Sequence, residues 1–159
     1  MRLKRAFRWF GLGLALGLVT LQAPSVLAGA DNELNGNGTV QASTTVTSAV
    51  TTTGSTFYNY HFRGIVLTVY TTTLTGTSST LTVTVQTKDP LSGNWVALPG
   101  CATAAINSVT VTMLVCYPGI NVSANSTVST ILPYQWRIVS TAGGTPTNVT
   151  WTVGGQFLQ

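Results

Sequence analysis

The chain has 159 residues, enough for one domain together with a targeting segment. Charged side chains make up 6% of it, and the formal net charge of +4 comes from four basic residues at the start, Arg2, Lys4, Arg5 and Arg8. The rest carries three basic and three acidic residues, so it lacks the clustered Lys and Arg that nucleic-acid binding needs.

Residues 1–28 are typical of a secretory signal peptide. A basic start precedes the apolar run Trp9–Leu21, and Val26-Leu27-Ala28 places small residues before a cleavage site at Gly29. The apolar run is shorter than the roughly 20 residues that span a bilayer, although an uncleaved anchor is the alternative. We therefore expect a secreted, cell-surface or extracellular-particle protein that meets the membrane only through this segment, before cleavage.

Residues 29–56 are predicted to be a flexible arm or edge strands. They begin Gly- and Asn-rich and continue Thr- and Val-rich, with few sizeable apolar side chains: Leu34, Val40, Val46 and Val50. These four define a candidate assembly arm, which would add a strand to a neighbouring subunit through main-chain hydrogen bonds. The alternative is that the segment forms the first strands of its own domain.

Residues 57–159 alternate apolar and polar side chains with period two, which predicts β-strands. The clearest strands are expected over 62–74, 80–87, 94–98, 106–117, 134–141 and 148–153. Turns are predicted at Gly76–Ser79, Lys88–Gly93 and Gly143–Pro146, where Gly, Pro, Asp and Ser gather. Short strands at this spacing predict an all-β fold, an antiparallel β-sandwich of the jelly-roll or immunoglobulin-like type.

Two cysteines, Cys101 and Cys116, are predicted to form a disulfide, because an even count in an exported chain favours one. In the chain-entropy model a loop of this length contributes about 3 kcal/mol. Two reduced, buried thiols are the alternative. No metal site or other cofactor is predicted, since two thiols and the single His61 do not supply four ligands.

Catalysis is not expected, because His61 is the only histidine and the few carboxylates form no convincing pair. Among the aromatic residues, Trp136 and Trp151 are expected in the core. Trp95 and Tyr117 are candidate ligand-binding aromatics that would stack on sugar rings. Arg137 is a candidate salt-bridge partner of Asp89.

Several short motifs follow one another in a particular order along the last hundred residues. They are Arg63-Gly64, Lys88-Asp89-Pro90-Leu91-Ser92-Gly93-Asn94-Trp95, Leu98-Pro99-Gly100, Tyr117-Pro118-Gly119-Ile120, Leu132-Pro133-Tyr134-Gln135-Trp136-Arg137, Gly143-Gly144-Thr145-Pro146 and Val153-Gly154. In this order the chain resembles a family of small β-rich virion structural or hypothetical proteins of tailed phages and prophages. The resemblance implies a structural protein without enzymatic activity. The export leader and the cysteine pair depart from that family and suggest a cell-surface or filament subunit.

These observations predict a non-catalytic exported structural subunit that self-assembles or decorates a larger particle: a virion, a surface layer or a filament. After the leader, the three basic and three acidic residues cancel, and a net charge near zero favours association because it lowers repulsion. The alternative is a secreted carbohydrate-binding or adhesive module. A glycan-binding protein should expose an aromatic pair on one face, whereas a structural subunit should bury its aromatics and expose strand edges.

Overall fold

A computed structural model describes residues 35–159, and within them it contains strands and no helix. The all-β prediction is confirmed. The predicted signal peptide over residues 1–28 and the assembly-arm residue Leu34 lie outside the described residues. The strands are β1 (Asn35–Val46), β2 (Val50–Tyr58), β3 (Gly64–Lys88), β4 (Trp95–Ala102), β5 (Val111–Cys116), β6 (Thr127–Val128) and β7 (Gln135–Leu158).

Hydrogen bonds join all seven strands into one sheet with the order β1-β7-β3-β5-β6, while β2 pairs with β7 and β4 pairs with β3. The sheet is mixed rather than purely antiparallel, because the short strand β6 runs parallel to β5. The expected strand over 106–117 is shorter than predicted: Ile106 forms only an isolated bridge to Leu81, and β5 begins at Val111.

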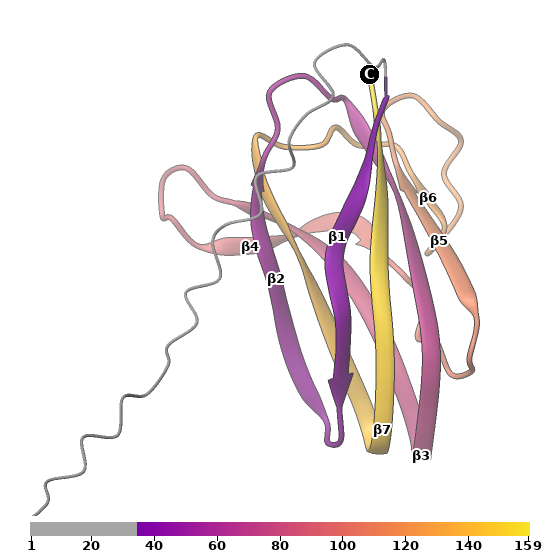
Figure 1. Cartoon of the computed structure of the whole chain (residues 1–159). Coiled ribbons are helices and arrows are strands. Elements are labelled where there is room, and N and C mark those ends of the chain that lie inside the picture. Colours follow the sequence, from indigo (N-terminus) through magenta and orange to yellow (C-terminus); the bar gives the residue numbers. More distant parts are fainter. Residues whose placement is uncertain (1–34) are drawn as a thin grey trace, which may run out of the picture.

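The long strands β3 and β7 pair with each other along almost their whole length, from Gly64 opposite Leu158 to Thr87 opposite Trp136. Figure 1 shows both strands bent into a V, with the bend at the end of the molecule away from the C-terminus. The segments predicted as turns, Gly76–Ser79 and Gly143–Pro146, lie at this bend, so the chain changes direction there, but no loop interrupts either strand. Both segments continue through the bend as paired strand with register shifts.

Glycine makes this shared bend sterically accessible. Gly76 has a φ of 119° and Gly144 a φ of 76°, backbone conformations that residues with a Cβ rarely adopt. A side chain on Gly144 would also collide with the carbonyl of Ser78, and one on Gly76 with the carbonyl of Thr145. The two strands can therefore turn the corner in contact with each other.

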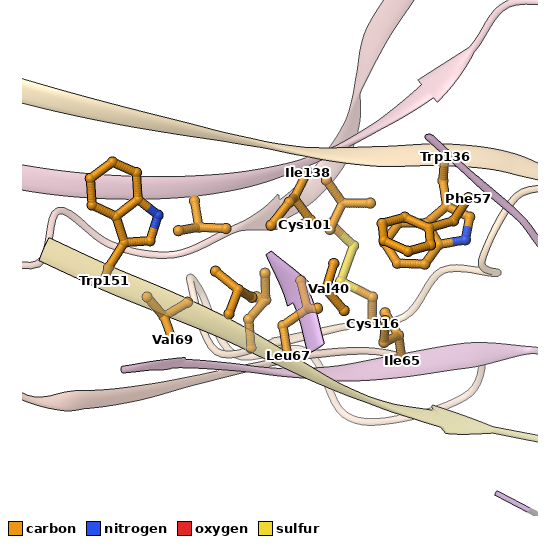
Figure 2. Close-up of a cluster of buried hydrophobic side chains, with 14 of the residues drawn as sticks. Val40, Phe57, Ile65, Leu67, Val69, Cys101, Cys116, Trp136, Ile138 and Trp151 are labelled. Atoms are coloured by element: carbon orange, nitrogen blue, oxygen red, sulfur yellow. A yellow bond between two sulfur atoms is a disulfide. The ribbon is translucent and has the colours of Figure 1, made fainter. Parts of the chain in front are cut away.

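The bend divides the β3–β7 ribbon into two limbs. The first limb consists of residues 64–75 and 148–158 and carries β1 and β5, while the second consists of residues 80–87 and 136–143 and carries β2 and β4. The alternating residues buried along the ribbon come from both limbs: Ile65, Leu67, Val69, Leu81, Val83, Val85, Ile138, Val149, Trp151 and Val153. In Figure 2 the side chains of the two limbs point toward one another. The core therefore lies between the limbs.

The two large core aromatics behave as the sequence predicts. Trp136 and Trp151 are both almost fully buried. The Trp136 ring stacks on Phe57 of β2 with ring centroids 4.7 Å apart (Figure 2). This pair joins β2 to the core at the end of the molecule opposite the bend.

The predicted disulfide is present in the structure. The sulfur atoms of Cys101 and Cys116 lie at bonding distance, their Cα atoms are 6.1 Å apart, and both residues are fully buried. Because β4 belongs to the second limb and β5 to the first, the bridge crosses the core and links the limbs covalently (Figure 2).

The segment predicted as an assembly arm is part of this chain's own sheet, which is the second of the two alternatives. β1 pairs with β7 from Asn35 to Val46, and Val40 is buried against Gly155, where an added Cβ would collide with it. Val46 packs at the margin of the core, whereas Val50, the first residue of β2, is exposed. In the structure these residues therefore form strands of their own chain's sheet.

A buried polar contact further fixes the position of β1. The hydroxyl of Ser140, in the second limb, donates a 2.8 Å hydrogen bond to the Gln41 side-chain carbonyl, and both residues are buried. The Gln41 amide in turn donates to the Thr44 hydroxyl at 3.2 Å. A paired amide in the core favours one register, because any slip would leave its polar atoms without partners.

Threonine hydroxyls pair across the outer surface of the sheet. Such pairs join Thr45 to Thr150 at 2.9 Å and Thr51 to Thr141 at 3.3 Å, on β1–β7 and β2–β7 respectively. Cross-strand pairs of this kind contribute roughly 0.2–1 kcal/mol each. The high threonine content therefore follows from long, outward-facing strand surfaces.

Candidate ligand-binding surfaces

Trp95 and Tyr117, the predicted ligand aromatics, are both half-buried and lie against different arginines. The guanidinium carbon of Arg137 lies 4.2 Å from the centroid of the Trp95 ring. The Tyr117 ring lies 5.7 Å from the guanidinium carbon of Arg63, and its hydroxyl donates to the Gln159 carbonyl at 2.8 Å. The Tyr117 hydroxyl is therefore already hydrogen-bonded to the residue that follows β7, whereas Trp95 belongs to a larger group of side chains.

Three exposed tyrosines gather where β2 ends and β7 begins. Tyr58, Tyr60 and Tyr134 are 56%, 70% and 56% exposed. The Tyr134 ring makes edge contacts with the other two, with centroids 5.7 Å from Tyr58 and 5.4 Å from Tyr60. We refer to these three residues as the tyrosine cluster. Large, exposed rings held together in this way are a common feature of binding surfaces.

The loop that carries Tyr60 is held in place by Asn59. The Asn59 side-chain amide donates to the carbonyls of Phe62 at 2.7 Å and Leu132 at 2.9 Å, and its carbonyl accepts from the Phe62 N–H at 2.9 Å. The Asn59 N–H also donates to the Tyr134 carbonyl at 2.7 Å. These bonds tie the 59–62 loop to the start of β7, so the cluster is built on a braced support.

The pKa of Tyr134 is raised above its ordinary value. The main cause is the 3.3 Å hydrogen bond that its hydroxyl donates to the Tyr60 hydroxyl; partial burial and the neighbouring phenols add to the shift. The phenol therefore stays neutral at physiological pH and keeps its hydroxyl as a hydrogen-bonding group.

Arg137 lies on the outer surface of the same sheet region, because its neighbours Trp136 and Ile138 point into the core. Its guanidinium covers the Trp95 ring, and its Nε donates a 2.9 Å hydrogen bond to the Gln86 side-chain carbonyl. Burial lowers its pKa, but an arginine remains charged at neutral pH.

The suggested Arg137–Asp89 salt bridge does not form. Asp89 instead stabilises its own turn: its carboxylate accepts hydrogen bonds from the hydroxyl and N–H of Ser92 and from the N–H of Leu91. These bonds lower the pKa of Asp89, the Ser92 hydroxyl contributing most. Within residues 35–159, Asp89 is the sole acidic residue, so Arg137 has no carboxylate partner there.

The tyrosine cluster and Arg137 belong to one continuous surface. Tyr58 is opposite Gln135 in the β2–β7 register, and the Gln135 amide reaches the Tyr58 hydroxyl at 3.5 Å. Arg137 lies two residues further along β7, on the same side. We call this surface the aromatic face; it consists of Tyr58, Tyr60, Tyr134, Gln135, Arg137, Gln86 and Trp95.

A second surface, of different chemistry, covers the outside of the first limb. Outward-pointing residues of β3 and β5 are opposite one another in consecutive pairs: Val66 with Val115, Thr68 with Met113 and Tyr70 with Val111. Val111 and Met113 are 58% and 56% exposed, and Tyr70 is exposed as well. We call these six residues the apolar face. It contains no charged side chain.

Other kinds of site find little support in the described part of the chain. Among residues 35–159, no group of three or more His, Cys, Asp or Glu residues is arranged to hold a metal ion. His61 is exposed, with its ring 6.4 Å from that of Tyr60. In the same region no helix is long and apolar enough to cross a membrane.

The part of the chain that the structure describes is all-β and carries two exposed surfaces, the aromatic face and the apolar face. No protein-family model, curated protein or solved structure matches the chain. Its function is therefore inferred from these surfaces.

Proposed function

We propose that the chain is a non-catalytic exported structural subunit, which associates with copies of itself or with a larger particle such as a virion, a surface layer or a filament. The apolar face carries this proposal. Its exposed members are Tyr70, Val111 and Met113, and exposed apolar side chains gathered on one face are typical of a protein interface. A second copy is the natural occupant, because two uncharged faces can meet without repulsion.

The fold proposed for this subunit is a β-sandwich of jelly-roll or immunoglobulin-like type. Its support is the division of the bent ribbon into two limbs, each with its own partner strands and with the core between them. Export is supported by the disulfide, which persists in oxidising compartments, and by the leader pattern in the sequence. N-terminal sequencing of the exported protein should find Gly29 first, and an intact Met1 would contradict export by cleavage.

Self-association is tested with a charge placed in the apolar face. The exported protein should form oligomers or larger particles in light scattering and negative-stain microscopy. Met113→Lys should weaken this association by about tenfold or more, because burying an unpaired ammonium costs more than the ~1.4 kcal/mol that a tenfold change represents.

A matched control introduces the same charge elsewhere. Leu91 is 96% exposed in the 89–93 turn, so Leu91→Lys should leave association unchanged. A wild-type protein that remains monomeric at high concentration would overturn the proposal, as would assembly that tolerates Met113→Lys.

A second candidate function, a secreted carbohydrate-binding or adhesive module, is favoured by the tyrosine cluster. Exposed aromatics gathered on one surface are the feature expected of a glycan-binding protein. The aromatic face lies on the second limb and the apolar face on the first, so one chain could bind through both surfaces at the same time.

A further inference from the structure

We propose that the aromatic face is a binding site for an acidic polysaccharide, with Arg137 as the residue that recognises the sugar carboxylate. This inference rests on the second candidate function, glycan binding, and names the class of glycan. It is independent of self-association through the apolar face.

The position of Arg137 carries the argument for an anionic ligand. The Trp95 ring supports one side of the guanidinium, and Gln86 accepts the hydrogen bond from its Nε. These two contacts fix the plane of the group, yet neither uses the two Nη nitrogens. Among residues 35–159 no side chain or carbonyl accepts a hydrogen bond from these nitrogens, which have the geometry to bind a carboxylate through two parallel hydrogen bonds.

The charge around Arg137 also favours an anion. Lys88 is directly opposite Trp95 in the β3–β4 register, so a second cation lies in the same region. Asp89, the single acid of residues 35–159, is engaged by Ser92 and Leu91 in its own turn. An incoming carboxylate would therefore encounter two cations and a single anion, whose carboxylate oxygens already accept hydrogen bonds in the turn.

The tyrosine cluster makes a sugar the fitting carrier of that carboxylate. A pyranose ring presents a face of C–H groups that packs on an aromatic ring, and hydroxyl groups at its edge. The cluster supplies exposed rings together with phenol hydroxyls, and Gln135 beside Tyr58 supplies an amide. Because Asn59 braces the loop that carries Tyr60, little ordering is required when a ligand binds.

The extent of the face suits a chain of sugars rather than one. Tyr58 lies on β2 opposite Gln135, and Arg137 follows two residues later on β7. Trp95 lies further across the sheet, on β4, which pairs with β3. Neighbouring units of a uronic-acid polymer could thus contact the tyrosines and the arginine at once.

The experiment measures binding of the exported protein to three uronic-acid polymers: polygalacturonate, alginate and hyaluronate. Each is compared with its own methyl-esterified form, which keeps the sugar backbone but masks the carboxylates. We expect binding to at least one of the three and weaker, residual binding to its esterified form. Arg137→Gln should weaken binding to the acidic polymer by about tenfold to 100-fold. Tyr60→Ala should weaken binding to the acidic polymer and to its esterified form.

The matched control is Arg63→Gln. It changes the net charge by the same amount but lies against Tyr117, at a different place. Equal losses from Arg63→Gln and Arg137→Gln would reveal non-specific attraction and overturn the proposal. Failure to bind any of the three polymers would overturn it too. Binding of esterified polymers that depends on Tyr60 but not on Arg137 would overturn the acidic ligand while leaving glycan binding in place.

Discussion

Replacing Thr71 by valine should make this protein more stable. Thr71 is fully buried in β3, and its hydroxyl has no hydrogen-bond partner within residues 35–159. Opposite it in the register stands Trp151, whose indole N–H is likewise buried and unpaired in the same part of the chain. Folding therefore removes the hydroxyl from water without replacing its hydrogen bond, and valine would have no such penalty.

The size of the effect follows from the cost of burying an unpaired polar group, about 1–3 kcal/mol. Valine has nearly the same shape as threonine and an equal preference for strands, so packing and propensity should change little. For a domain of this size each kcal/mol shifts the melting temperature by about 4 °C. We therefore expect an increase of about 4–12 °C.

Thr103 provides the matched comparison. It is also buried, but its hydroxyl accepts a 3.1 Å hydrogen bond from the N–H of Val83. Thr103→Val leaves that N–H buried without a partner and should lower stability by about 1–3 kcal/mol. The same chemical substitution should thus have opposite signs at the two sites.

Urea unfolding followed by tryptophan fluorescence measures both variants, and the midpoint should move while the slope stays constant. A Thr71→Val protein that is less stable than the wild type would refute the reasoning. It would show that the hydroxyl has a partner, such as a buried water shared with the Trp151 indole.

Three other predictions test the wider fold. Replacing both Cys101 and Cys116 by serine should lower stability by about 3 kcal/mol in the chain-entropy model, measured by urea unfolding against the wild type, and an unchanged midpoint would contradict a bridge. Deleting residues 29–53 should unfold the protein by circular dichroism, because β1 inserts Val40 into the core; a folded, monomeric product would instead restore the assembly arm. The lowered pKa of Asp89 means that its contribution to stability is present above the ordinary carboxyl pKa of about 4 and is lost as pH falls through the lower folded value. Acid titration of unfolding should show this loss in the wild type and not in Asp89→Asn, and identical pH profiles would count against the turn contacts.

The sequence predicts best those features that depend on neighbouring residues. Alternation over 80–87 correctly identifies Leu81, Val83 and Val85 as core residues, since period two leaves one side of a strand apolar. The glycines at positions 76 and 144 mark the places where the chain changes direction, but the local pattern cannot tell a loop between two strands from a bend within one. Whether a glycine ends a strand depends on what the partner strand does beside it.

Strand β5 shows a different limit of prediction from sequence, because the pattern does not identify its buried side. The strand alternates apolar residues on both sides, and Leu114 together with Cys116 points inward while Val111 and Met113 point out. Nothing within such a strand says which side is buried. The disulfide settles it in the structure, because Cys116 must face Cys101 across the core.

The tyrosine cluster could not be assembled from the sequence, because Tyr60 and Tyr134 are 74 residues apart. The sequence shows Tyr58 and Tyr60 close together, but nothing in it brings Tyr134 to them. Tyr134 shares its alternation with Trp136 and Ile138, so period two alone would place all three side chains in the core. Its location just before β7 begins, rather than within the strand, explains why it is exposed.

The pairing of β1 with the end of β7 has a mechanical consequence. Asn35 lies opposite Leu158, so the first and last strand residues of the described chain are neighbours at the same end of the molecule. A load pulling these two residues apart would break the β1–β7 hydrogen bonds one after another, as in opening a zipper, and a small force would suffice. A load entering through the apolar face would act across the broad side of the first limb, where the hydrogen bonds of several strands bear it together. Within an assembly, the chain would resist tension through its faces far better than through its ends.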